Sequence, residues 1–193
     1  MTPALATGAA RRLTPMPAAL ALELSWLDFY RASELHGGLV LGRLAQRVRD
    51  GALALQLLRH SAEEVEHARL WAETSLALGG RLRPAPRTYQ EGYAAVLGPP
   101  RTIVEVLALT QVFERRVYRH FTRHLRRPGT HPLVAATLHR MLEEERDHLG
   151  WVRRWLDERT DREETEALLA RYAAADELLY QEFLTLYRWR DVP

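Results

Sequence analysis

Two pairs of residues in this chain have the types and the spacing of metal ligands. Glu64 and His67 lie three residues apart, and Glu145 and His148 repeat that spacing later in the chain. In a helix, residues three apart lie on one face, so each pair can direct a carboxylate oxygen and an imidazole nitrogen to one point. The two copies therefore indicate two metal ions or one shared site.

Each pair follows a single glutamate on the inward stripe of an earlier predicted helix. Glu34 precedes Glu64, and Glu114 precedes Glu145 at almost the same interval. This internal repeat suits a dinuclear site. An unpaired buried carboxylate costs about several kcal/mol, whereas four carboxylates balance the charge of two divalent ions. Unless these are solvated helix faces, the predicted ligands are Glu34, Glu64, His67, Glu114, Glu145 and His148.

The register of the two motifs needs a choice, because each contains adjacent glutamates. Glu63 and Glu144 also lie within about one helical turn of the histidines. We prefer Glu64 and Glu145, because the residues one and two turns away from them are mostly those of a core-facing stripe.

Three further side chains lie one turn from a predicted ligand. His60, Tyr30 and Tyr118 are candidates for hydrogen bonds to the ligand carboxylates, and the tyrosines also for electron donation. Packing, or a surface position for His60, is at least as good an interpretation of each. The other histidines are expected on the surface or in the core: His36, His120, His124, His131 and His139.

Helical periodicity and capping signals predict an all-α chain with no strand. We expect a flexible segment at 1–16 and a single domain at 17–193, with a short helix possible at 88–96 and long helices over about 17–49, 52–79, 102–127, 132–158 and 162–189. The Pro- and Gly-punctuated stretch at 80–100 is long enough to cross a bundle and join two parallel helices. Gly37 and Gly38 follow Glu34, which indicates either space beside that carboxylate or close packing of another helix.

The composition of the chain limits the possible metal ligands and binding partners. The 193 residues include no cysteine, so any metal must be held by Glu, Asp, His or backbone atoms. All 27 basic residues are Arg, and the net charge of +2 is too small to indicate nucleic acid by itself. No apolar run is long enough for a membrane span, and no signal-peptide core follows Arg11 and Arg12. We therefore expect a cytoplasmic protein.

A glutamate, a Glu-x-x-His, a second glutamate and a second Glu-x-x-His on four successive helices resemble the di-iron carboxylate proteins of the ferritin-like superfamily. The resemblance covers about residues 20–158 and implies a left-handed four-helix bundle with a long crossover between helices two and three. The fifth, C-terminal helix that we expect lies outside the resemblance. It also implies two iron ions, or manganese, bridged by Glu64 and Glu145. Their shells would be completed by Glu34 with His67 and by Glu114 with His148.

The departures from known members leave the subfamily open. Rubrerythrins carry another glutamate one turn after the third-helix glutamate, where this chain has Val117. Ribonucleotide reductase small subunits place a radical tyrosine where this chain has Trp71. The doubled motif is more similar to bacterioferritin, rubrerythrin and the bacterial di-iron oxygenases than to ferritin.

The resemblance implies an oxidoreductase that uses O2 or peroxide and an external electron donor to oxidise or hydroxylate a substrate that the sequence does not identify. One alternative is a ferroxidase or peroxide-scavenging protein without an organic substrate, and another is a vestigial or structural site. A homodimer is one option for its assembly. A tRNA-hydroxylase-like enzyme would use the arginines of the third long helix: Arg115, Arg116, Arg119, Arg123, Arg126 and Arg127.

Overall fold

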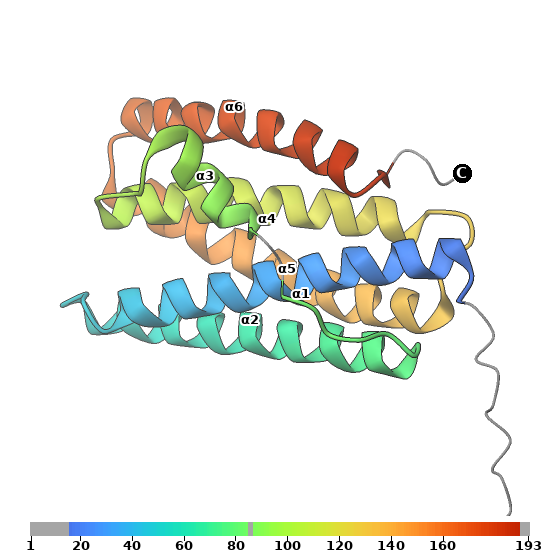
Figure 1. Cartoon of the computed structure of the whole chain (residues 1–193). Coiled ribbons are helices and arrows are strands. Elements are labelled where there is room, and N and C mark those ends of the chain that lie inside the picture. The colour runs from blue at the N-terminus through green and yellow to red at the C-terminus, as the bar shows by residue number, and fades with distance from the viewer. Residues whose placement is uncertain (1–15, 85–86, 190–193) are drawn as a thin grey trace, which may run out of the picture.

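The computed structural model describes residues 16–84 and 87–189, so the segment expected to be flexible at 1–16 lies outside the described residues except for Met16. Within them the chain is all-helical and contains no strand, which confirms the predicted all-α class (Figure 1). The helices are α1 (Ala18–Ala45), α2 (Gly51–Ala77), α3 (Tyr89–Leu97), α4 (Ile103–Leu125), α5 (Pro132–Arg159) and α6 (Arg162–Leu186).

Side-chain caps explain where several of these helices begin. Asp50 accepts hydrogen bonds from the backbone amides of Ala52 and Leu53 at the start of α2, and Asp161 caps α6 in the same way. Thr88 and Thr102 each form a capping box at the start of α3 and α4. α1 ends at Ala45, earlier than the predicted residue 49, and Asp50 takes an extended conformation as the N-cap of α2.

The long helices pack as two hairpins. α1 packs along α2 and α4 along α5, while α2 also contacts α5. Figure 1 shows that α2 and α4 run in the same direction, because the connection that contains α3 returns along the molecule. α6 lies over α4, and α3 packs against α6 and α1.

An apolar core fills the space between α1, α2, α4 and α5. Leu27, Leu57, Leu107 and Leu138, one each from α1, α2, α4 and α5, are fully buried. In the described part of the chain, no helix has both the length and the apolar composition needed to cross a bilayer.

The paired glycines of α1 meet different surroundings. A Cβ atom on Gly38 would lie 2.9 Å from the carbonyl oxygen of Ser61 and 2.9 Å from Cγ2 of Val65, so Gly38 allows α1 and α2 to approach closely. A Cβ atom on Gly37 would lie at an ordinary 3.4 Å from Gln90 Nε2 and from Glu64 Oε2. The close-packing interpretation therefore applies to Gly38, whereas the space at Gly37 lies beside Gln90 and Glu64 and not beside Glu34.

Candidate metal centre

The structure brings all six predicted ligands together from four helices. Glu34 comes from α1, Glu114 from α4, and each Glu-x-x-His pair from α2 or α5. Their exposed fractions lie between 0% and 2%. Atoms that could bind a metal form two groups, and within each group they all lie within 4.8 Å of one another. The first group comes from Glu34, Glu64, His67 and Glu145. The second comes from Glu64, Glu114 and His148 together with His60.

Glu64 and Glu145 lie between the two imidazoles. Nδ1 of His67 is 3.8 Å from Oε1 of Glu64 and 3.6 Å from Oε1 of Glu145. Nδ1 of His148 is 3.3 Å from Oε1 of Glu64 and 3.6 Å from Oε2 of Glu145. Both carboxylates thus face both histidines through Nδ1.

The other nitrogen of each histidine is held by a glutamate on the opposite helix. His67 Nε2 lies 2.8 Å from Oε2 of Glu144, and His148 Nε2 lies 2.8 Å from Oε2 of Glu63. With a metal ion bound, a proton on Nε2 would satisfy each carboxylate and leave the lone pair of Nδ1 directed inward, as a metal ligand requires. The hydrogen bond from His148 is the main cause that lowers the pKa of Glu63.

These two glutamates appear in the sequence analysis only as alternatives in the register of the motifs. Glu63 and Glu144 keep 48% and 34% of their side-chain exposure, whereas Glu64 and Glu145 are buried. The doubled glutamate in both motifs is the signal for the crossed pairs, because the first of the two faces the rim and the second faces the centre.

Burial of so many carboxylates perturbs their protonation. Loss of solvation raises the pKa of Glu34 well above its ordinary value, and the charge of Glu64 acts in the same direction. Loss of solvation and the charge of Glu114 raise the pKa of Glu145. Burial also acts to raise the pKa of Glu64, but the adjacent imidazoles hold it well below its usual range. The charges are therefore only partly compensated by protein groups.

Many buried polar atoms of this cluster have no hydrogen-bond partner among the described residues. They include both oxygens of Glu64 and Glu145, Oε2 of Glu34 and Glu114, and Nδ1 of His67 and His148. Orphaned buried acceptors cost about 1–3 kcal/mol each, so an arrangement with this many calls for a further partner. Carboxylate oxygens and imidazole nitrogens that converge are the donor set of Fe, Mn or Zn, so the residues fit a metal site.

The three neighbouring candidates lie in different places. His60 is buried, with Nε2 at 3.2 Å from Oε1 of Glu64 and 3.4 Å from Oε1 of Glu114. The Tyr30 hydroxyl is 2.7 Å from Nε2 of His120, so its hydrogen bond goes to an imidazole of α4 and not to a carboxylate. Tyr118 differs from the expectation, because its hydroxyl accepts hydrogen bonds from the Arg146 guanidinium at the surface.

Tyr30 belongs to a buried polar network beside the carboxylates. Its hydroxyl is also 3.2 Å from Nδ1 of His124, whose Nε2 is 3.3 Å from Oε1 of Glu23. Nδ1 of His120 is 3.1 Å from the hydroxyl of Tyr180 on α6. A small cavity of about 30 Å³ is lined by Tyr30 and His120 of this network and by the candidate ligand Glu34, among others. That volume suits one or two water molecules.

A larger cavity reaches the carboxylates from the side covered by α3. It has a volume of about 250 Å³, and Glu64 and Glu114 form part of its wall. Gly37 and Gln90 also line it, and Oε1 of Gln90 is a buried acceptor with no hydrogen-bond partner in the described residues. The rest of the wall is largely apolar: Val40, Leu41, Ala94, Val106, Leu109 and Phe113.

Two arginines of the cluster on α4 and just beyond its end contact α6. Arg116 forms ion pairs with Asp176 at 2.6 Å and with Glu177 at 2.8 Å. Arg123 donates a hydrogen bond to the hydroxyl of Tyr180 at 3.2 Å. These contacts give two of the six arginines a role in holding α6 against α4.

Comparison with known proteins finds no relative of this chain: no protein-family model, no curated protein and no solved structure matches it. The interpretation of the site therefore depends on its own geometry and chemistry.

Proposed function

We propose that this protein is a ferritin-like oxidoreductase that holds two iron ions, or two manganese ions, and uses O2 or peroxide to oxidise or hydroxylate a small organic substrate. The observation that carries the proposal is the convergence of buried, unpartnered oxygen and nitrogen atoms from four helices. Two divalent ions supply the partners that these atoms lack and balance the charge of four carboxylates.

In the proposed centre Glu64 and Glu145 would be shared by the two ions, while Glu34 with His67 and Glu114 with His148 would hold one ion each. The position of the two bridging carboxylates between the Nδ1 atoms of both histidines supports this assignment. The crossed hydrogen bonds that His67 donates to Glu144 and His148 donates to Glu63 fix the orientation of the rings. Such bonds also raise the basicity of the ligand nitrogens.

The arrangement of the helices supports the ferritin-like part of the proposal. Two hairpins, α1–α2 and α4–α5, each supply one single glutamate and one Glu-x-x-His. The connection between them returns along the molecule, so that α2 and α4 run in the same direction (Figure 1). A bundle with one long crossover has this connectivity.

Iron or manganese bound by carboxylates and imidazoles supplies redox chemistry with O2 or peroxide. The residues of this chain would bind the substrate beside the ions and exclude water from it. The cavity of about 250 Å³ is below the usual 300–1,000 Å³ of sites for drug-sized ligands, and its wall is largely apolar. It therefore favours a small, largely apolar molecule with one hydrogen-bond donor for Gln90.

This cavity is also the reason to place an organic substrate ahead of the ferroxidase alternative, since oxidation of Fe(II) needs no apolar chamber. The tRNA-hydroxylase-like alternative has less support, because Arg116 and Arg123 are engaged by α6. With no cysteine in the sequence, the proposed enzyme carries no thiolate-bound redox centre, and its electrons come from an external donor.

The test is metal content and O2 consumption. Protein expressed with added iron should contain two metal ions per chain by mass spectrometry and should consume O2 when Fe(II) is supplied to the metal-free form. Glu64→Ala and His148→Ala should lose both properties. Glu66→Ala is the matched control, because Glu66 lies on the same helix but pairs with Arg69 at the surface. Wild-type protein without bound metal, unchanged in O2 consumption by the site variants, would refute the proposal.

A further inference from the structure

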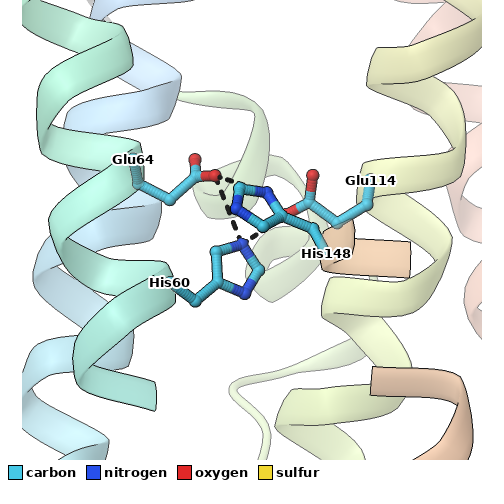
Figure 2. Close-up of side chains that lie close together, drawn as sticks. All are labelled: His60, Glu64, Glu114 and His148. Carbon is cyan, nitrogen blue, oxygen red and sulfur yellow. Dashed lines mark ion pairs between the residues drawn. The ribbon is translucent and has the colours of Figure 1, made fainter. Parts of the chain in front are cut away.

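His60 is not one of the six predicted ligands, but it is buried among them. It is one turn before Glu64 on α2 and is 1% exposed. Its Nε2 is 3.2 Å from Oε1 of Glu64 and 3.4 Å from Oε1 of Glu114. Figure 2 shows that His60, Glu64, Glu114 and His148 point toward one another, from α2 on one side and from α4 and α5 on the other.

The ring of His60 is held in a fixed orientation but makes no hydrogen bond. It stacks on the ring of His148, with centroids 3.7 Å apart and planes at 28°, and it meets Trp151 edge-on at 5.7 Å. Within the described residues, neither ring nitrogen has a partner with hydrogen-bond geometry. A buried imidazole whose nitrogens make no well-aligned hydrogen bond is costly unless something else binds one of them.

The other half of the internal repeat has no counterpart of this imidazole. The residue one turn before Glu145 on α5 is Met141, which is fully buried. The two groups of ligand atoms also differ: one contains two histidines, His60 and His148, whereas the other contains His67 alone. The two halves of the centre are therefore chemically unequal.

We infer that His60 is a seventh protein ligand, bound through Nε2 to the same ion as His148 and Glu114. The inference rests on the proposed dinuclear function and adds that its two positions differ. The position with two imidazoles should fill first with ions that favour nitrogen ligands, such as Fe(II), Co(II) or Zn(II). The position with one imidazole is richer in carboxylate oxygen, so it should accept Mn(II) more readily.

Cobalt(II) is a suitable probe, because its visible absorption and its X-ray absorption both report its ligands. Metal-free wild-type protein titrated with Co(II) should bind two ions in two resolved steps. X-ray absorption of a sample with one equivalent should show two imidazoles per cobalt. With His60→Met, which copies the residue of the other half, the first step should weaken by more than about tenfold, and one equivalent should show one imidazole.

The reciprocal change tests the same idea from the other half. Met141→His should place a second imidazole beside His67 and bring the two binding steps closer together. One imidazole per cobalt in the wild-type sample, or a titration of His60→Met that superimposes on the wild type, would overturn the inference while leaving the dinuclear centre intact. Wild-type protein that binds no Co(II) would instead overturn the proposed function itself.

Discussion

Glu64 is the residue on which the two halves of the candidate centre meet, since its carboxylate belongs to both groups of ligand atoms. Such a site lowers the stability of the metal-free protein, because four carboxylates are buried close together: those of Glu34, Glu64, Glu114 and Glu145. The charge of Glu64 helps to raise the pKa of Glu34, which is the signature of like charges held at short range. Stability and metal binding should therefore respond in opposite directions to the same substitution.

Glu34→Gln should separate these two effects. The amide keeps the shape of the carboxyl and removes the cost of burying or protonating it, so the metal-free protein should become more stable by about 1–3 kcal/mol. Metal affinity should fall by at least about tenfold, because an amide is a weaker ligand for Fe(II) or Mn(II). Urea unfolding of the metal-free proteins and titration with Mn(II) measure the two quantities. A metal-free variant less stable than the wild type would contradict this prediction.

His120 should give the metal-free protein a component of stability that depends on pH. Burial lowers its pKa well below the ordinary 6.5, and electrostatic repulsion between the protonated forms of His120 and His124 acts in the same direction. The folded state therefore keeps His120 neutral while the unfolded state takes up a proton as the pH falls below about 6.5. That contribution is present at neutral pH and is lost on acidification, at up to about 1.4 kcal/mol per pH unit.

The measurement is urea unfolding of the wild type and of His120→Gln at pH 7.5 and pH 5.5. The wild type should lose about 1 kcal/mol more than the variant between the two values. The comparison cancels the buried carboxylates, which titrate in both proteins. An equal loss in the two proteins would show that His120 is protonated in the folded state.

At the scale of elements, the spacing of α1 from α2 and the position of α3 decide what surrounds the ligands. Gly38 lets the two helices of the first hairpin touch, and the hydroxyl of Ser61 donates a hydrogen bond to its carbonyl at 2.7 Å. α3 covers the larger cavity, and the side chain of Gln90 donates a hydrogen bond to the Ser33 carbonyl of α1 at 3.0 Å. The crossover therefore forms part of the site.

The two glycines offer a matched pair of substitutions. Gly38→Ala should destabilise the protein by about 1–3 kcal/mol, because its Cβ would press on the Ser61 backbone and on Val65. Gly37→Ala should leave stability unchanged or raise it by up to about 1 kcal/mol, because its Cβ meets only ordinary contacts and alanine favours a helix. Thermal unfolding distinguishes the two, and equal effects would contradict the close approach at Gly38.

The cavity beneath α3 can be tested without knowledge of the substrate. Indole is a small, mostly apolar probe with one donor, and ligand-observed NMR should detect its binding to the wild type. Val106→Trp should abolish that binding by filling the cavity, with metal content unchanged. Val96→Trp, at an exposed position of α3, is the control. Binding of indole to both variants would place the probe elsewhere.

At the scale of the whole molecule, the parts of the site that follow from helical spacing were within reach of the sequence. Glu64 and His67 must share a face, and the stripe that contains them is buried as expected. Contacts between helices could not be predicted from the sequence, since they depend on the rotation of α2 against α5. The crossed bonds of Glu63 and Glu144 and the depth of His60 are of this kind. Tyr118 shows that helical spacing alone can mislead. It lies one turn from Glu114, but its hydroxyl contacts Arg146 at the surface.

The placement of the ligands also predicts how metal should affect the fold as a whole. Each proposed ion binds side chains from both hairpins, since Glu64 and His67 lie on α2 while Glu145 and His148 lie on α5. For each of the two sites, metal at 100 times the dissociation constant stabilises the folded protein by about 2.7 kcal/mol. For a chain of 193 residues this is a rise in Tm of about 5–10 °C.

Thermal unfolding with Mn(II) and with excess chelator measures this shift, and Glu64→Gln should abolish most of it. Hydrogen exchange then locates the effect. Because the ions join the hairpins, metal should slow exchange in α1, α2, α4 and α5 together and should raise the free energy of their opening as one unit. Protection confined to α1 and α2 would mean that the ion is held by one hairpin alone, and the shared centre around Glu64 and Glu145 would have to be abandoned.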